Sequence, residues 1–378
     1  MARLGDICDI VSGSTPKSNV PEYWDGDIKW ITPAELDQDT YIINDSVRHI
    51  TELGVAKTGL KPFPKGTVIL SSRAPIGKTA IAGCEMYCNQ GFKNLICSDK
   101  INPRYLYWFL TCNTEYLNSL GRGATFKEIS KEIVANIEIP LLSIENQIAV
   151  AKKFEKISEL IALRKEQLAK LDQLVKSRFI ELFGAISANT CTRQIKDYAD
   201  VLGGYAFKSE LFCSDAIPVI RISNISNGIV ELDYTVCFSE AFWNENRRFR
   251  AEKGDILMAM SGATTGKAGL YNENTPALIN QRVACLRAKN EIACPAFLYV
   301  ATQLDWMYDL IQESSAGCAQ PNISGKQIEN MPVPDATYEQ QLQFAAFVEQ
   351  TDKSKLAIQQ SLDKLELLKK SLMQQYFG

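Results

Sequence analysis

The sequence predicts an α+β fold in which two copies of a mixed α/β unit are separated by a long antiparallel two-helix coiled coil, with pseudo-two-fold symmetry. Three observations predict this architecture. The motifs of the first half return in the same order in the second half, each half begins with short strand patterns, and each half ends in a long heptad pattern.

The internal repeat is visible as matched motifs along the whole chain. The segment LGDICDIVSG (4–13) matches IKDYADVLGG (195–204). Farther along, Gly77-Lys78 matches Gly266-Lys267, Asn89-Gln90 matches Asn280-Gln281, and Phe183-Gly184 matches Phe377-Gly378. The separation between partners varies because loops of different length join equivalent elements. The preserved order indicates a tandem duplication, which explains why the same helix ending occurs twice.

The first part of each unit combines strand patterns with helical ones. GTVILSS (66–72) and KTAIAG (78–83) carry alternating apolar and β-branched residues near glycine and proline, which is typical of strands. Residues 104–120 and 295–312 have helical apolar spacing, and Pro103 and Pro295 suit helix starts. Each unit is therefore expected to contain both helices and strands.

The last part of each unit is predicted to be a long helix. Its apolar heptad positions form the expected seam of a coiled coil. The seam residues are Phe154, Ile157, Ile161, Leu168, Leu171, Val175 and Leu182 in the first helix, and Leu342, Ala345, Val348, Ile358, Leu362, Leu365 and Leu372 in the second. Two independent helices that each cover their own domain are the alternative. The predicted domains are 1–142 (recognition domain 1), 143–184 (central helix), 185–336 (recognition domain 2) and 337–378 (C-terminal helix).

Composition excludes several classes of protein. The net charge is −3 and no apolar run approaches the length of a membrane span. The start of the chain lacks the pattern of a signal peptide, so the eleven cysteines are expected to be reduced thiols in the cytoplasm. Since His49 is the only histidine and no CxxC motif occurs, no metal site is expected.

Motifs that would indicate catalysis are incomplete. APIGKT (74–79) and SGATTGKAG (261–269) resemble a phosphate loop, but Ser72 and Ser261 replace its first glycine. NPRY (102–105) differs from the loop of amino-methyltransferases at Arg104, and no glycine-rich cofactor motif precedes it. We therefore expect no catalytic residue and no cofactor in this chain, which is not predicted to be an enzyme.

Local positive charge favours a polyanionic ligand. The segment between Leu53 and Cys84 holds five cations and no acid, and residues 247–267 also carry an excess of cations. Cations on loops suit contact with phosphates. A solvated charged face would have the same composition, so the pattern alone leaves both interpretations open.

Several segments in this order resemble the specificity subunit of type I restriction–modification systems, which are bacterial defence systems. The resemblance is carried by PEYWDGDIKWITPAEL (21–36), FPKGTVILSSRAPIGKTAI (63–81), CNQGFKNL (88–95) and IEIPLLSIENQIAV (137–150) before a long helix. It covers the whole chain. It implies a non-catalytic DNA-binding subunit in which each recognition domain reads one half of a split site.

The resemblance also implies partners. Double-stranded DNA with a bipartite site, two methyltransferase subunits and the restriction and translocase subunits would join this chain, with no membrane involved. The helices would set the spacing between half-sites, about one helical turn or ~34 Å, and dock the methyltransferases. S-adenosylmethionine, ATP and Mg would be bound by those partner subunits.

The comparison of the two copies selects candidate DNA-contacting residues. Residues shared by both copies cannot distinguish two half-sites, so Asn89-Gln90 and its counterpart are expected to hold a turn. Polar residues that differ are the candidate base readers, because Arg and Lys suit guanine and amides suit adenine: Arg73, Lys93, Arg122, Lys127, Ser261, Arg282, Gln320 and Asn322. The candidate phosphate contacts are Lys57, Lys61, Lys78, Arg247 and Lys267.

Two other functions fit the same residues. One is a duplicated coiled-coil adaptor that binds protein or glycan. The other is the recognition subunit of a type II-like restriction system whose catalytic groups lie in another chain. Salt-sensitive duplex binding separates the adaptor from the DNA-reading subunit.

Overall fold

The tertiary structure consists of two units, and each unit includes part of both long helices. The computed structural model describes residues 1–37, 40–73, 75–123, 127–184, 193–226, 228–233, 235–315 and 321–378. Unit 1 comprises Met1–Arg164 and Ser361–Gly378, and unit 2 comprises Lys165–Gln360. The long helices are α6 (Ile144–Phe183) and α12 (Tyr338–Phe377), so α6 starts in unit 1 and ends in unit 2, and α12 does the reverse.

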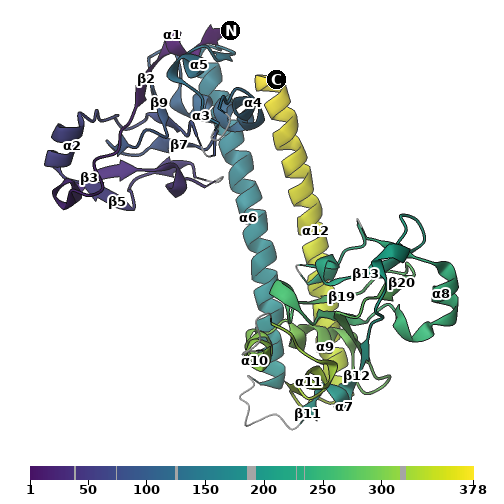
Figure 1. Ribbon diagram of the computed structural model, residues 1–378. Coiled ribbons are helices and arrows are strands. Elements are labelled where there is room, and N and C mark those ends of the chain that lie inside the picture. The colour runs from purple at the N-terminus through teal and green to yellow at the C-terminus, as the bar shows by residue number, and fades with distance from the viewer. Residues whose placement is uncertain are drawn as a thin grey trace. The chain divides into compact units, whose positions relative to one another are not determined.

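Unit 1 is built on a sheet with the strand order β2-β9-β6-β7-β4, of which Figure 1 labels β2, β9 and β7. A smaller sheet has the order β5-β3-β8, and β1 pairs with β10. The strands are β1 (Ala2–Arg3), β2 (Cys8–Ser12), β3 (Trp24–Ile31), β4 (Ile42–Ile43), β5 (Arg48–Ile50), β6 (Val68–Leu70), β7 (Thr79–Ala82), β8 (Tyr87–Cys88), β9 (Lys93–Cys97) and β10 (Glu138–Ile139). The shorter helices are α1 (Leu4–Ile7), α2 (Glu52–Thr58), α3 (Pro103–Cys112), α4 (Thr114–Ser119) and α5 (Lys131–Ala135).

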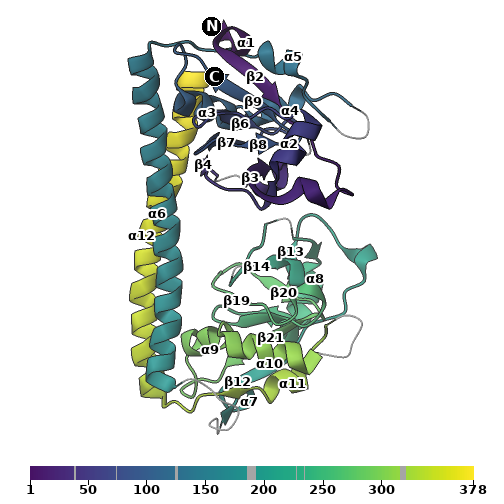
Figure 2. The ribbon, with the colours of Figure 1, turned by 90° about the vertical axis from the view of Figure 1, so that its left-hand side faces the viewer.

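Unit 2 repeats this plan with a sheet in the order β12-β21-β18-β19-β15-β14 (Figure 2). A second sheet has the order β16-β13-β20-β17, and β11 pairs with β22. The strands are β11 (Arg193–Gln194), β12 (Ala199–Gly203), β13 (Ile217–Ile220), β14 (Ile225–Ser226), β15 (Ile229–Val230), β16 (Cys237–Phe238), β17 (Arg250–Ala251), β18 (Ile256–Ala259), β19 (Ala268–Leu270), β20 (Ala277–Ile279), β21 (Val283–Ala288) and β22 (Pro332–Val333). The shorter helices are α7 (Ile195–Tyr198), α8 (Glu240–Glu245), α9 (Pro295–Thr302), α10 (Asp305–Ser315) and α11 (Gly325–Glu329).

Strand pairings in the two units correspond in both order and direction. The pairs β2–β9, β9–β6 and β6–β7 are antiparallel, as are β12–β21, β21–β18 and β18–β19. The exceptional parallel pairs also recur, β4–β7 as β15–β19 and β3–β8 as β13–β20. Gly77 and Gly266 occupy equivalent turns of the two units. Their φ angles are 97° and 86°, a backbone conformation that favours glycine. The predicted duplication is therefore present in the fold.

Each expected helical segment before the long helix is in fact two helices. Residues 104–120 form α3 and α4, and residues 295–312 lie in α9 and α10. The start of α3 follows the expectation, since the Asn102 side chain accepts hydrogen bonds from the amides of Arg104 and Tyr105. The continuous apolar spacing concealed the break because both helices of a pair bury residues in the same core.

The long helices pack against each other in antiparallel fashion within each unit. In unit 1 the ring of Phe154, near the start of α6, stacks on Phe377 at the end of α12, with centroids 5.5 Å apart. In unit 2 the ring of Phe179, near the end of α6, lies 5.4 Å from Phe344 near the start of α12. All four rings are also part of the hydrophobic cores, so the helices cover the domains as well as each other. Among the described residues, no helix is both long and apolar enough to span a bilayer.

The coiled-coil seam is partly as predicted. The buried seam residues are Phe154, Ile157, Ile161, Val175, Val348 and Leu362, while Leu168, Leu171, Ala345, Ile358, Leu365 and Leu372 are half-buried. The prediction is wrong for Leu182 and Leu342, which are 39% and 47% exposed. Phe179 and Phe344 are buried instead, because the ends of the helices face the core of unit 2 as well as the partner helix.

A buried glutamine fixes the start of each long helix. In unit 1 Gln147 is fully buried, accepts from the Asn102 amide at 2.7 Å and donates to the carbonyls of Lys100 and Leu142 at 3.0 and 2.8 Å. The side chain thereby satisfies three backbone groups that would otherwise lose hydrogen bonds on burial. The helix is consequently tied to the loop that precedes α3.

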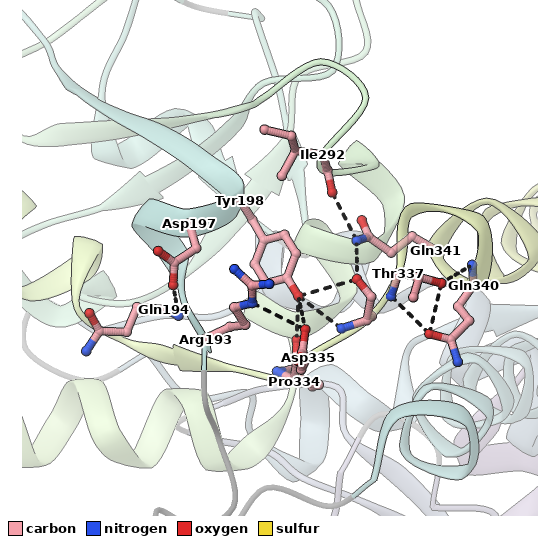
Figure 3. Close-up of polar contacts among 11 residues, drawn as sticks. Arg193, Gln194, Asp197, Tyr198, Ile292, Pro334, Asp335, Thr337, Gln340 and Gln341 are labelled. Atoms are coloured by element: carbon pink, nitrogen blue, oxygen red, sulfur yellow. Dashed lines mark hydrogen bonds and ion pairs between the residues drawn. The ribbon is translucent and has the colours of Figure 1, made fainter.

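Unit 2 contains the same device at Gln341, and Figure 3 shows its bond to Ile292. Gln341 accepts from the Cys294 amide at 2.9 Å and donates to the carbonyls of Ile292 and Ala336 at 3.1 and 3.0 Å. Beside it, the Tyr198 hydroxyl donates to the carbonyl of Pro334 at 3.1 Å and accepts from the Ala336 amide at 3.0 Å. The bonds of Tyr198 join α7 to the segment that enters α12.

Candidate nucleic-acid interface

Three segments of unit 1 meet beyond the ends of β6 and β9. The Ser72 amide donates to the Gly91 carbonyl at 2.8 Å, and the Ile129 amide donates to the Ser72 carbonyl at 2.9 Å. Glu128 forms single antiparallel backbone bridges with both Arg73 and Arg122. The four candidate base readers of this unit lie on these segments, so the structure brings them together. We call these four residues together with Glu128 the first edge: Arg73, Lys93, Arg122, Lys127 and Glu128.

The first edge offers cations of different accessibility. Arg122 and Lys127 are exposed and Arg73 is half-buried. The backbone bridge holds Arg122 in place, with hydrogen bonds of 3.0 and 2.9 Å to Glu128. Exposed guanidinium and ammonium groups on a fixed backbone can donate to guanine or to phosphate.

Lys93 differs from this prediction. It is only 7% exposed, and its ammonium binds Ser72 Oγ and the Glu128 carboxylate, each at 3.2 Å. A donor that is buried and already paired is not available to a base edge. Lys93 therefore holds Ser72 and Glu128 together beneath the surface of the first edge and is not a direct base reader in this conformation.

The second edge has the same backbone construction in unit 2. The Met260 amide donates to the Arg282 carbonyl, and the Ile323 amide donates to the Met260 carbonyl, both at 2.9 Å. Ser261 forms an antiparallel bridge with Asn322. We define the second edge as Ser261, Arg282 and Asn322, three of the predicted base readers. The fourth, Gln320, lies outside the described residues.

Side chains on the second edge differ in chemistry from those on the first. Arg282 and Asn322 are exposed, and Ser261 is half-buried. The Ser261 hydroxyl oxygen is buried and has no hydrogen-bond partner among the described residues. The matching bridges place Ser261 where unit 1 has Arg73, and Asn322 where unit 1 has Glu128. One scaffold thus presents two different sets of donors and acceptors.

The shared Asn-Gln pairs hold a turn, as expected. Asn89 Oδ1 accepts from the Gly91 amide at 2.8 Å, and Asn280 Oδ1 accepts from the Arg282 amide at 3.2 Å. Such a side-chain turn fixes the residue two positions on. It therefore orients the backbone of both edges in the same way.

The candidate phosphate contacts have different surroundings. Lys57 on α2, Lys61 after it and Arg247 in the short 3₁₀ helix Arg247–Phe249 are exposed but lie outside the hydrogen-bonded edges. Lys267 is exposed and lines a cavity of about 340 Å³. Lys78 contradicts the prediction, because its ammonium donates to the carbonyls of Leu36 and, at 3.3 Å, Pro33. It holds a turn of unit 1.

Glu128 is the member of the edges that the sequence analysis missed. Glu128 is a single carboxylate among the cations of the first edge. Its side chain is 42% exposed and bound to Lys93. The detectable signal was its position in the GRGATFKEIS loop (121–130), which precedes the first long helix just as the loop with Asn322 precedes the second.

The edges do not resemble a catalytic centre. Within the described ranges, no three His, Cys, Asp or Glu side chains are grouped to hold a metal. Cys88, beside Asn89, is a thiol whose pKa burial raises to about 12, so it stays protonated and poorly nucleophilic. The exposed groups can donate and accept hydrogen bonds, which suits recognition.

Comparisons with known proteins agree on one family. The profile of the family described as "Type I restriction modification DNA specificity domain" matches residues 1–173 and 189–367. A type I restriction enzyme MjaIX specificity subunit from Methanocaldococcus jannaschii is 34% identical over 60% of this chain, an alignment that spans 58% of that relative's length. The MjaVIII specificity subunit of the same organism is 24% identical over 99% of this chain and 90% of its own length.

Solved structures show the same fold. The S subunit of a type I restriction–modification system from M. genitalium has a TM-score of 0.56 and 18% identity, over 100% of this chain and 95% of the other. A chain from a structure described as underlying complex assembly and conformational transition of the type I R-M system has a TM-score of 0.63 and 19% identity, over 100% and 96%.

Proposed function

The chain belongs to the type I restriction–modification DNA specificity family and carries two copies of its domain, and from this premise we propose that it is a non-catalytic sequence-specificity subunit. Each unit reads one half of a bipartite site in double-stranded DNA. The first edge faces one half-site and the second edge faces the other.

The observation that carries the proposal is that the two edges share matched backbone hydrogen bonds but have different side chains. Ser72 and Met260 make equivalent hydrogen bonds, but the neighbouring positions are Arg73 and Ser261. An adaptor with two equal binding sites would have no need to change the exposed polar groups while keeping the turn that supports them. Readers of two different half-sites require that combination.

Sequence-independent affinity comes from cations outside the edges. Lys57, Lys61, Arg247 and Lys267 are exposed, and none of them has an ion-pair partner within the described residues. Cations without acidic partners release counterions from DNA when they bind phosphate, so affinity falls as salt rises. These four residues are our proposed phosphate contacts.

The long helices connect the two readers and supply the surface for partner subunits. Two methyltransferase subunits bind along α6 and α12, and the restriction and translocase subunits join this assembly in the cytoplasm. S-adenosylmethionine, ATP and Mg are bound by those subunits. Both helices are continuous, α6 from Ile144 to Phe183 and α12 from Tyr338 to Phe377. This continuity supports a spacer of constant length.

The test is to express the chain with its methyltransferase partner in cells that lack other DNA methylation, and to sequence the methylome. We expect methylation within a single bipartite motif whose halves are separated by a constant number of unspecified base pairs. Methylation without a bipartite motif, in a complex that is assembled and active, would contradict the proposal.

A further inference from the structure

An acceptor stands among the donors of the first edge. The Glu128 side chain is 42% exposed, and its backbone is paired with Arg73 on one side and Arg122 on the other. Exposed Lys127 precedes it. A carboxylate facing a polyanion is unfavourable unless its charge is compensated, so its presence on this edge requires an explanation.

The buried ammonium of Lys93 compensates the charge of this carboxylate. Lys93 is 7% exposed, and its ammonium lies 3.2 Å from both the Glu128 carboxylate and Ser72 Oγ. Ser72 is fully buried and its backbone connects the Gly91 and Ile129 segments. The buried ammonium both neutralises the carboxylate and holds it on a rigid support, while leaving much of it open to solvent.

A compensated carboxylate can distinguish bases because it only accepts hydrogen bonds. In the major groove, cytosine presents the N4 amino group and adenine presents the N6 amino group, whereas guanine O6 and thymine O4 are acceptors that repel a carboxylate. An acidic side chain that accepts from cytosine N4 is an established mode of readout. Adenine is read better by an amide, which pairs with both N6 and N7.

Resting on the proposed function, we propose that Glu128 is a specificity-determining residue that accepts a hydrogen bond from cytosine N4 in the first half-site, and that Lys93 is its positioning residue. Asn322 takes the equivalent place in the second half-site and reads adenine. The bridges Arg73–Glu128 and Ser261–Asn322 make these positions equivalent. The two halves of the recognised site therefore differ at matched base pairs because the acceptor is a carboxylate in one unit and an amide in the other.

A purely structural role for Glu128 has different consequences. An ion pair that only joins the 122–128 segment to β9 would, when broken, weaken binding to all sequences alike. A reader that is lost changes preference at one base pair and leaves the others intact. Position-resolved preference therefore separates the two roles.

The experiment selects duplexes from a pool of randomised double-stranded DNA with the full chain in complex with its methyltransferase partner. We compare the wild type with Glu128→Gln, which keeps size but adds a donor, and with Lys93→Met, which removes the support. Glu132→Gln, an exposed carboxylate on α5, is the matched control. In the second unit, Asn322→Asp is the reciprocal change.

We expect Glu128→Gln to lose about tenfold in preference for cytosine at one base pair of the first half-site, with the second half-site unchanged. Lys93→Met should weaken preference at the same base pair, and Asn322→Asp should shift one base pair of the second half-site away from adenine. Glu132→Gln should select the wild-type motif.

A motif unchanged by Glu128→Gln, with affinity for all duplexes lowered uniformly, would overturn the proposal in favour of the structural role. A wild-type preference for adenine at the Glu128-dependent base pair would overturn the assignment of cytosine. If the wild-type complex selected no bipartite motif at all, the proposed function itself would fail, a result that is distinguishable from both.

Discussion

Both units anchor the segment before their long helix by a tyrosine hydroxyl bound to a proline carbonyl, but the tyrosines come from different elements. In unit 1 Tyr105 on α3 donates to Pro140 at 2.8 Å. In unit 2 Tyr198 on α7 donates to Pro334 at 3.1 Å. At the position that Tyr105 occupies in unit 1, unit 2 has Phe297, which cannot donate.

The comparison shows which part of the duplicated unit was constrained. The proline carbonyl must be satisfied in both copies because it is close to the core, and either tyrosine can satisfy it. The backbone geometry has been retained while the side chains that support it have changed. The two edges follow the same rule, with one hydrogen-bonded frame and different exposed groups.

The largest effect is expected where the end of α12 enters unit 1. Phe377→Ala should lower the free energy of unfolding of unit 1 by about 3–5 kcal/mol, as for a buried ring. Phe377 is 7% exposed and contacts Tyr105, Phe109 and Phe154. Native-state hydrogen exchange of the β6 and β9 amides measures the loss.

The matched change Phe183→Ala in unit 2 should cost less. Phe183 is only half-buried, and Phe179 and Phe344 would still fill its neighbourhood. Equal losses in the two units would show that the ends of α6 and α12 are more alike in their packing than the structure indicates.

A second difference between the units is an ion pair on β21 of unit 2, at a position where β9 of unit 1 has an apolar residue. Arg287 on β21 binds the buried Asp255 at 2.9 and 2.7 Å and Glu252 at 2.8 Å. The equivalent residue of β9 is Ile96, because Ile96 pairs with Asp9 on β2 as Arg287 pairs with Asp200 on β12. Arg287→Met should destabilise unit 2 by about 3 kcal/mol because it leaves a buried carboxylate without its partner.

Hydrogen exchange of β18 and β21 measures this loss, and exchange of β6 and β9 should stay unchanged. The double variant Arg287→Met with Asp255→Asn should recover part of the stability, since the uncompensated charge is gone. Destabilisation of both units by the single variant would mean that the units do not unfold independently.

The two tyrosines should contribute similarly despite their different origins. Tyr105→Phe and Tyr198→Phe should each cost about 1 kcal/mol, the usual loss for one hydrogen bond, in unit 1 and unit 2 respectively. Thermal unfolding followed with hydrogen exchange assigns each loss to its unit. A loss confined to one of the variants would show that the two anchors are not equivalent.

Alkaline pH provides a further check on Tyr105. Burial raises the pKa of Tyr105 from 10.0 to about 12, so the unfolded phenol ionises first. The resulting stabilisation is complete below about pH 10 and is lost as pH rises towards 12. Tyr105→Phe should remove this part of the pH dependence, and an unchanged alkaline profile would contradict it.

The smallest expected effect concerns the shared lysines. Lys267→Ala should reduce the slope of log affinity against log salt by about 1 and weaken binding to all duplexes alike. Lys78→Ala should leave the slope unchanged, because Lys78 is bound to the carbonyls of Leu36 and Pro33. Titrations of one duplex at several salt concentrations measure both. A reduced slope for Lys78→Ala would show that its ammonium leaves the turn to bind phosphate.

The repeated architecture could be predicted from sequence because its constraints lie in backbone turns. Gly77 and Gly266 adopt positive φ, and Asn89 and Asn280 close the same side-chain turn. Such positions accept few residue types, so they survive as recognisable motifs. The order of these motifs was sufficient to predict both units and the helix that follows each.

The availability of individual lysines could not be predicted. Lys78 is bound by carbonyls 42 and 45 residues away, and Lys93 by a carboxylate 35 residues away. Sequence shows a cation but does not show which distant acceptor the fold brings to it. Glu128 was not predicted for the same reason, since its partner Lys93 lies on β9, 35 residues away in the sequence.

The heptad pattern failed at the ends of the helices that lie in unit 2. A heptad describes a helix that faces one partner, whereas the end of α6 and the start of α12 also face the core of unit 2. Leu182 and Leu342 are therefore exposed, and Phe179 and Phe344 are buried. From Phe154 to Val175 the predicted seam residues are buried or half-buried.

The most direct test of the central claim exchanges residues 1–142 for the recognition domain of another family member and sequences the methylome produced with the methyltransferase partner. If each unit reads one half-site on its own scaffold, one half of the motif changes while the other half and the spacer stay constant. A motif that changes in both halves, or in neither, would contradict the account.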